Sequence, residues 1–326
     1  MTDRCRVSVV IPAYNVGRFI DEALASVADQ RRPAHEVIVV DDGSTDDTNA
    51  RVRAWNGRCG STPLHLLDGP NRGLSVSRNR GILASCGELL AFLDGDDCYL
   101  PHHLERLVPV FSLVPGLVVA FGDLARFEET RGELGGNLEL IRAQLRQIST
   151  PIDASDLQLL GPDLRAVFVD QAMILPSSWV VSRTAVARAG MFDPTVAYAE
   201  DLDFLWRVLG TGPAAWFDGP TARRREHDNN ASNPRRAAWS EPEVLRVVAR
   251  LRRASPGRTA AESRALERLM TRTLFETGWL AAGDGLGRYL AWRDEAKALC
   301  GHPVPFSMRL SLRAIRSGIG RAHNER

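Results

Sequence analysis

The chain contains very little lysine and almost no net charge. Lysine and arginine together account for 41 of its 326 residues, and Lys297 is the only lysine. We interpret this bias toward arginine as the codon composition of a GC-rich genome. The 40 aspartate and glutamate residues bring the formal net charge to +1. A balanced charge of this kind argues against a dedicated nucleic-acid-binding protein.

Cysteines and long apolar runs are also scarce. The five cysteines include no Cys-x-x-Cys pair, and a small, odd number of free thiols is typical of a protein of the reducing cytosol. No run approaches the ~18 apolar residues that span a bilayer. The apolar run at 7–13 is too short for a signal peptide and contains Pro12. We therefore expect a cytoplasmic location.

Short apolar runs separated by helical patterns predict the fold. Buried strands are expected at 7–12, 36–40, 64–67 and 89–93. Helical spacing follows the first strand at 19–28 and precedes the fourth at 75–85. Strands that alternate with helices favour an α/β fold with a mostly parallel, doubly wound sheet and flanking helices.

The pattern changes after Pro234 to arginine-rich amphipathic helices. We predict an α/β domain over residues 1–234 and a helical C-terminal extension over residues 235–326. Near the end, an apolar helical stripe lies beside arginines and consists of Met308, Leu312, Ile315 and Ile319. This stripe suits either peripheral contact with a membrane surface or a packed terminal helix with a solvated face. The sequence leaves the oligomeric state open.

An acidic cluster directly follows the fourth predicted strand. Asp94, Asp96 and Asp97 place three carboxylates within four residues, and like charges this close destabilise one another unless a cation lies between them. Carboxylate oxygens suit Mg²⁺ or Mn²⁺, and Mg²⁺ is commonly completed by substrate phosphates. The alternative is a solvated acidic turn.

Two other predicted strands also end in polar residues. Residues 12–15 follow the first strand and residues 41–44 follow the second. In parallel sheets, ligands bind outside the carboxyl ends of the strands. Three such ends together favour a binding crevice for a phosphate-bearing ligand over three unrelated turns.

Six segments in order resemble the family 2 inverting glycosyltransferases, which have the GT-A fold. They are VSVVIPAYN (7–15), VVDDGSTD (39–46), NRGLSVSRNRG (71–81), FLDGDD (92–97), Glu200-Asp201 and HDNNAS (227–232). The resemblance covers roughly the first two-thirds of the chain, and ordered motifs identify the family but not the sugar.

The resemblance implies a set of residues around the nucleotide and the donor sugar. They are Pro12, Tyr14, Asp41, Asp42, Asn71, Gly73 and Arg78. Tyr14 corresponds to a position near the base, Asp42 to the residue that binds the uracil edge, and Asp41 to the ribose side. The stretch from Asn71 to Arg78 resembles the segment that closes over the nucleotide and sugar.

The same resemblance implies the metal and catalytic residues. Asp94 resembles the ribose-side member of an Asp-x-Asp motif that also forms the metal site, and Asp96 resembles the metal ligand, with Asp97 as its alternative. Asp201 resembles the catalytic base, with Glu200 beside it in the acceptor site.

A late loop is implied to reach the diphosphate through Arg225, His227 and Ser232. Arg223 and Arg224 are alternative sources of the cation, because the three arginines are consecutive.

These residues imply an inverting transfer from a nucleotide-diphospho-sugar, with a UDP-sugar as the expected donor and Mg²⁺ or Mn²⁺ as the cofactor. The implied acceptor is a hydroxyl of a glycan or lipid-linked molecule of the cell envelope, at the inner face of the membrane. A non-catalytic nucleotide-sugar-binding protein and a polyprenyl-phosphate glycosyltransferase are the alternatives. A dehydrogenase or a nucleotidyltransferase would need a glycine-rich loop where residues 12–15 stand.

Overall fold

The computed structural model describes residues 5–55, 57–58, 60–171, 174–228, 230, 234–254 and 258–300. The chain divides into two compact units, Met1–Asp228 and Asn229–Arg326. The predicted domains, 1–234 and 235–326, stay a prediction, because this division does not test whether either part folds alone.

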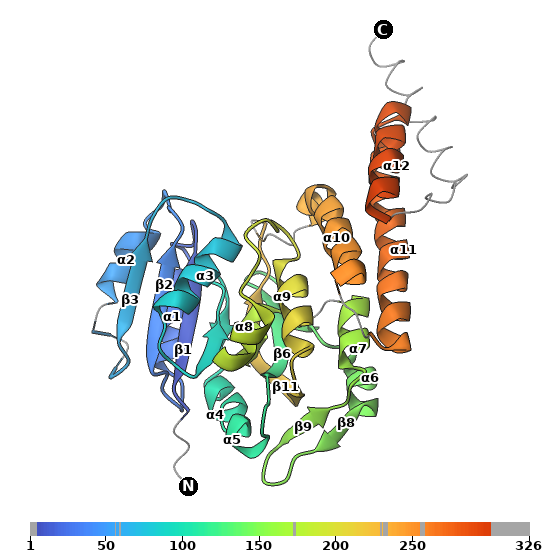
Figure 1. Ribbon diagram of the computed structural model, residues 1–326. Helices are drawn as coiled ribbons and strands as arrows, with labels where there is room; N and C mark the ends of the chain where they lie inside the picture. Colours follow the sequence, from blue (N-terminus) through green and yellow to red (C-terminus); the bar gives the residue numbers. More distant parts are fainter. Residues whose placement is uncertain are drawn as a thin grey trace. The chain divides into compact units, whose positions relative to one another are not determined.

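The first unit begins with a parallel half-sheet. Its elements in order are β1 (Val7–Ala13), α1 (Ile20–Ala28), β2 (Glu36–Asp41), α2 (Thr48–Ala54), β3 (Leu64–Asp68), α3 (Leu74–Ala84) and β4 (Leu89–Phe92). The spatial order is β3-β2-β1-β4, and all three pairs are parallel. The four predicted strands and the α/β fold class are therefore confirmed, and the carboxyl ends of β1, β2 and β4 meet at one edge (Figure 1).

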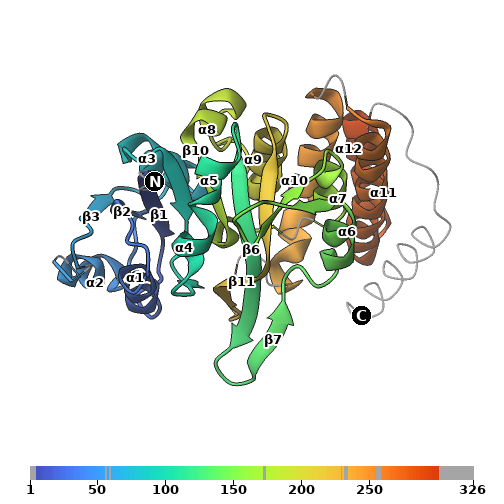
Figure 2. The ribbon, with the colours of Figure 1, turned by 90° about the horizontal axis from the view of Figure 1, so that it is seen from below.

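The sheet continues past β4 with mixed directions. The later elements are β5 (Cys98–Tyr99), α4 (His103–Leu107), α5 (Val110–Leu113), β6 (Val119–Glu128), β7 (Gly132–Gly136), α6 (Arg142–Gln147), β8 (Ser149–Pro151), β9 (Leu157–Leu160), α7 (Leu164–Gln171), η1 (Pro176–Ser178), β10 (Trp179–Ser182), α8 (Arg183–Ala189), α9 (Glu200–Leu209) and β11 (Ala214–Arg225). Strand β10 runs antiparallel between β4 and β6, and β11 runs parallel to β6. Figure 2 shows β7 folded back beside β6 as a hairpin.

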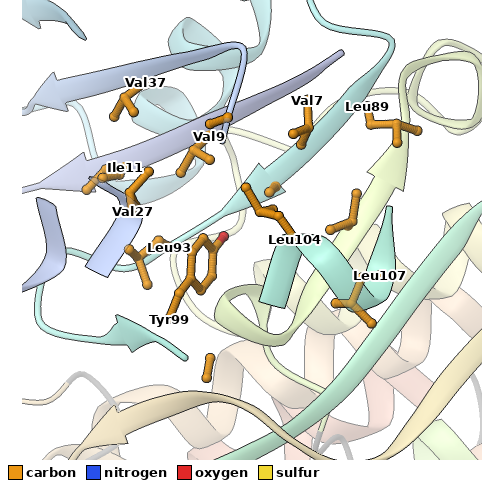
Figure 3. Packing of buried hydrophobic residues seen from close by; sticks show 14 of the residues in the cluster. Val7, Val9, Ile11, Val27, Val37, Leu89, Leu93, Tyr99, Leu104 and Leu107 are labelled. Atoms are coloured by element: carbon orange, nitrogen blue, oxygen red, sulfur yellow. The ribbon is translucent and has the colours of Figure 1, made fainter. Parts of the chain in front are cut away.

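The core of this unit explains why β1 is apolar at every position except Ser8. Every residue of β1 is buried, as expected for a parallel strand covered on both faces. On one face, Val7, Val9 and Ile11 pack toward Val27 of α1 and toward Leu104 and Leu107 of α4 (Figure 3). On the other face, α3 lies so close that a Cβ on Gly81 would stand 2.2 Å from Val10 Cγ1.

The second unit is helical in the residues that the structure describes. It contains α10 (Pro234–Ala254), α11 (Ala260–Gly283) and α12 (Leu286–Cys300). Helix α11 begins with a capping box in which Thr259 and Glu262 exchange side-chain and backbone hydrogen bonds. Trp292 donates from Nε1 to Thr277 Oγ1 at 2.9 Å and joins α12 to α11. None of the described helices is long and apolar enough for a membrane span. The predicted stripe at 308–319 lies outside the described residues.

Candidate active site

The segment between β4 and β5 that contains Asp94, Asp96 and Asp97, here called the acidic loop (residues 94–97), lies against the end of β1. The Asp97 backbone N–H donates to the Asp94 carbonyl at 2.9 Å and closes the loop as a turn. A Cβ on Gly95 would stand 3.0 Å from Val16 Cγ2 and 3.2 Å from the Pro12 carbonyl oxygen. Glycine is therefore the residue that lets this loop approach the first strand end so closely.

A buried arginine joins the acidic loop to the first turn of α9. Arg78 of α3 is 1% exposed. Its Nη2 donates to Asp94 Oδ1 at 2.8 Å and its Nη1 donates to Glu200 Oε1 at 2.7 Å, while its guanidinium lies over the Phe192 ring. Burial lowers the pKa of Arg78, but the two carboxylates outweigh burial and raise that pKa above its ordinary value. Arg78 therefore stays charged and connects two carboxylates that are far apart in sequence.

Asp201 stands next to this ion-pair bridge in an environment suited to proton transfer. Burial first, and then the charge of Glu200, raise the pKa of Asp201 to about 7, while Arg78 lowers it. The side chain accepts the Leu202 N–H at 2.8 Å and keeps partial solvent exposure. Before it, Ala199 has a positive φ of 61°, a conformation that non-glycine residues adopt at a cost. A carboxyl group with a pKa near 7 is suited to act as a general base.

The other two carboxylates of the acidic loop differ in accessibility. Asp96 has a side chain that is 22% exposed, and its Oδ2 lies 3.0 Å from His227 Nε2. Asp97 is 5% exposed and accepts from Ser177 Oγ at 2.7 Å and from the Arg225 backbone N–H at 3.1 Å. Burial, and after it the neighbouring carboxylates, raise the pKa of Asp97 well above its ordinary value, against these two hydrogen bonds.

The carboxylates at the end of β2, Asp41 and Asp42, organise the loops at this edge of the sheet. Asp42 accepts the backbone N–H groups of Arg72 and Gly73 at 2.9 and 2.8 Å. Asp41 accepts the backbone N–H of Ser44 at 2.9 Å. Both carboxylates are buried, so their implied roles toward the base and ribose stay predictions.

The remaining donor-side predictions also fall at this edge of the sheet. Tyr14 is 49% exposed, which leaves its ring accessible for stacking. Pro12 lies within β1 and is buried. Asn71 is exposed, and its backbone nitrogen would be 2.8 Å from a Cβ on Gly43, whose φ is +78°. The loop that includes Asn71 and Gly73 therefore runs directly over the end of β2.

The guanidinium of Arg225 is held within the protein. It forms ion pairs with Glu22 Oε2 at 2.6 Å and Glu129 Oε1 at 3.0 Å. The rings of Phe19 and Phe127 lie 4.9 and 4.7 Å from its central carbon. Arg225 is 2% exposed, so its side chain is engaged by two carboxylates at the position where the resemblance implied a diphosphate contact.

The neighbours of Arg225 point to different partners. Arg223 lies over the Phe127 ring at 4.1 Å, and Arg224 pairs with Glu226 at 3.6 Å. The predicted site residue Ser232 lies outside the described residues. Which cation reaches a diphosphate therefore stays a prediction.

The carboxylates fit a cation that a ligand completes. Among the described residues, no group of three or more histidine, cysteine, aspartate or glutamate side chains is arranged to hold a metal ion alone. Asp94 and Asp96 have side chains that are 33% and 22% exposed. Mg²⁺ in proteins often takes only one or two carboxylates, and phosphates and water provide the rest. The donor set fits this mode of binding.

Three residues at this site were not predicted from the sequence. Ser177, Glu22 and Glu129 contact the acidic loop or Arg225 from distant parts of the chain. Glu129 also pairs with Arg18. No local spacing marks these residues, because each contact depends on the tertiary fold.

Part of the chain matches the model of a known protein family. The family model described as "Glycosyl transferase family 2" matches residues 8–157, a stretch that includes the acidic loop and Arg78. This part of the chain is therefore similar to glycosyltransferase family 2. An uncharacterized glycosyltransferase of Nostoc sp. is 36% identical over 107 residues, which are 33% of this chain and 33% of that protein. The match thus spans about a third of that relative's length.

Solved structures show the same GT-A fold. S. aureus TarS matches with a TM-score of 0.64 at 18% identity, over 97% of this chain and 53% of TarS. Its 1–349 fragment was solved in complex with UDP-GlcNAc and has a TM-score of 0.62 at 16% identity, over 95% of this chain and 84% of the fragment. The Pyrobaculum calidifontis mannosyltransferase PcManGT, in complex with GDP-Man and Mn²⁺, has a TM-score of 0.61 at 18% identity, over 100% of this chain and 82% of PcManGT.

Proposed function

We propose that this protein transfers a sugar from a nucleotide-diphospho-sugar to an acceptor hydroxyl with inversion of the anomeric configuration. The main support is Arg78, which bridges Asp94 of the acidic loop and Glu200 beside Asp201. This bridge links a group suited to bind the donor with a carboxyl group whose pKa is raised to about 7. Such a pairing is expected where donor and acceptor meet.

The donor is proposed to be a UDP-sugar, with a GDP-sugar as the next candidate. The TarS fragment was solved with UDP-GlcNAc, and PcManGT with GDP-Man. Tyr14, Asp42 and the loop at 71–73 are proposed to bind the base and ribose, because Asp42 joins this loop to the end of β2 and Tyr14 is exposed after the neighbouring β1.

Asp96, with Asp94 beside it, is proposed to hold Mg²⁺ or Mn²⁺. Such an ion supplies positive charge that stabilises the diphosphate as negative charge develops on it. PcManGT was solved with Mn²⁺, which supports the choice of metal.

Asp201 is proposed to accept the proton of the acceptor hydroxyl as its oxygen attacks the anomeric carbon. The bond from that carbon to the diphosphate breaks on the opposite face, so an α-linked donor yields a β-linked product. Glu200 keeps the pKa of Asp201 high, and Arg78 limits the rise. A base of this kind typically contributes about 10²–10⁴-fold in rate.

The acceptor is proposed to be a glycan or a lipid-linked saccharide of the cell envelope, reached at the cytoplasmic face of the membrane. A polyprenyl phosphate is the alternative acceptor, and a non-catalytic nucleotide-sugar-binding role is the alternative function.

Asp201→Asn tests the catalytic role. We expect UDP to bind as in the wild type, while transfer from a panel of UDP-sugars, followed by UDP release, falls by about 10²–10⁴-fold. Asp203→Asn is the matched control, since Asp203 lies two residues on in α9 and pairs with Arg207. Wild-type transfer by Asp201→Asn would show that another group is the base. Binding of UDP-sugars without any turnover by the wild type would favour the non-catalytic alternative.

A further inference from the structure

We propose that Ser177 is a positioning residue for the acidic loop, and that Asp97 anchors this loop to the protein and does not bind the cation. This inference rests on the proposed function, because it assigns separate roles to the three carboxylates of the proposed metal site.

The Ser177 hydroxyl connects the two ends of the loop. Its Oγ accepts the Asp94 backbone N–H at 3.1 Å and donates to Asp97 Oδ2 at 2.7 Å. Ser177 lies in η1, just before β10, and is fully buried. One hydroxyl therefore fixes the backbone at the start of the loop and the side chain at its end, over a gap of 80 residues in sequence.

The other oxygen of Asp97 is also engaged by the protein. Asp97 Oδ1 accepts the Arg225 backbone N–H at 3.1 Å, and Arg225 Nε donates to the Asp96 carbonyl at 3.2 Å. Strand β11 thus holds the loop from a second side. With one protein donor on each oxygen and 5% exposure, Asp97 is directed away from solvent and into the fold.

The three carboxylates of the loop consequently point to three different places. Asp94 meets Arg78, Asp96 lies beside His227, and Asp97 meets Ser177. A cation that arrives with a phosphate needs accessible oxygens, which Asp94 and Asp96 present. Removal of a group that orients a metal ligand through hydrogen bonds, without touching the metal itself, typically weakens metal binding by about 10–100-fold.

Ser178 provides a closely matched control. It is the next residue in η1, is 2% exposed, and its hydroxyl donates to the Leu175 carbonyl at 2.7 Å. Ser178→Ala removes the same atoms from the same turn, but the lost hydrogen bond does not involve the acidic loop.

The experiment measures Mn²⁺ affinity by calorimetry in the presence of UDP, and in parallel with GDP. We expect Ser177→Ala to weaken Mn²⁺ binding by about 10–100-fold and Ser178→Ala to leave it within twofold or so of the wild type. Equal affinities in the two serine variants would overturn the proposal.

A second comparison keeps the test decisive if Ser177→Ala does not fold. An asparagine at position 97 keeps an oxygen acceptor for the Arg225 N–H and a polar group facing Ser177. We expect Asp97→Asn to weaken Mn²⁺ binding by about tenfold or less, and Asp96→Asn to abolish it. If Asp97→Asn is as damaging as Asp96→Asn, Asp97 is a ligand and the proposal is wrong. A wild type that binds nucleotide without any Mn²⁺ dependence would overturn both this inference and the proposed metal site.

Discussion

Asp201→Asn should make the protein more stable at neutral and alkaline pH, although it removes the proposed base. The pKa of Asp201 is raised from 3.8 to about 7, chiefly by burial and then by the charge of Glu200. Ionising this group therefore costs up to about 4 kcal/mol more in the folded protein than in the unfolded chain. Asparagine avoids that cost and keeps an oxygen that accepts the Leu202 N–H.

The sign of the pH dependence follows from the raised pKa. The contribution of Asp201 to stability is fully present below pH 3.8 and is lost as the pH rises through about 7. Between pH 5 and pH 8.5, about 3 kcal/mol of this loss develops in the wild type and none develops in Asp201→Asn. The advantage of the variant should therefore grow by up to that amount across this range.

Urea unfolding at pH 5 and pH 8.5 measures this difference, provided that fluorescence and circular dichroism transitions coincide. Asp203→Asn is the control on the same helix, and its effect should have the opposite sign. Asp203 is buried and paired with Arg207 at 2.8 Å, so its replacement should destabilise the protein by about 1–3 kcal/mol. An advantage of Asp201→Asn that does not increase with pH would refute the account of Asp201.

Two further predictions concern the active site and the fold. The ascending limb of the pH–rate profile should report the ionisation of Asp201. Glu200→Gln should move this limb to lower pH by on the order of one pH unit, and Arg78→Gln should move it to higher pH in the fraction that folds. An unchanged limb in either variant would contradict the causes assigned to the pKa of Asp201. Gly81→Ala should destabilise the protein by about 1–3 kcal/mol in thermal or urea unfolding, because the new Cβ meets Val10 Cγ1 at 2.2 Å. Gly287→Ala, whose new Cβ would meet nothing within 4 Å apart from its chain neighbours and its own helix backbone, should be neutral or stabilise by about 0.5–1 kcal/mol. Equal effects of the two changes would contradict the packing described for α3.

The parallel half of the sheet was predictable because its signals are local. Each of the four strands is a short apolar run. Polar residues follow within a few positions of each strand end that faces the site. The acidic loop and the first turn of α9 could be located in the same way. The proximity of the acidic loop to the ends of β1 and β2 followed from the general geometry of parallel sheets.

The connections within the site could not be predicted from local pattern. Arg78 and Glu200 are 122 residues apart, and Ser177 and Asp97 are 80 residues apart. Such pairs depend on how β10 and α9 pack against the first half-sheet. The resemblance implied a ligand contact for Arg225, which stays a prediction, and no spacing pattern indicated that Glu22 and Glu129 would pair with its guanidinium. Tertiary packing determines which partners a side chain contacts, and the local spacing of residues does not predict these contacts.

Calorimetry with UDP tests whether the acidic loop binds a nucleotide diphosphate through a divalent cation. We predict that UDP binds to the wild type in the presence of Mn²⁺, that omission of Mn²⁺ weakens binding strongly, and that Asp96→Ala abolishes the dependence on Mn²⁺. GDP and dTDP, measured in the same way, test the choice of base. Failure of all three nucleotides to bind the wild type, or binding that ignores both Mn²⁺ and Asp96→Ala, would contradict the account.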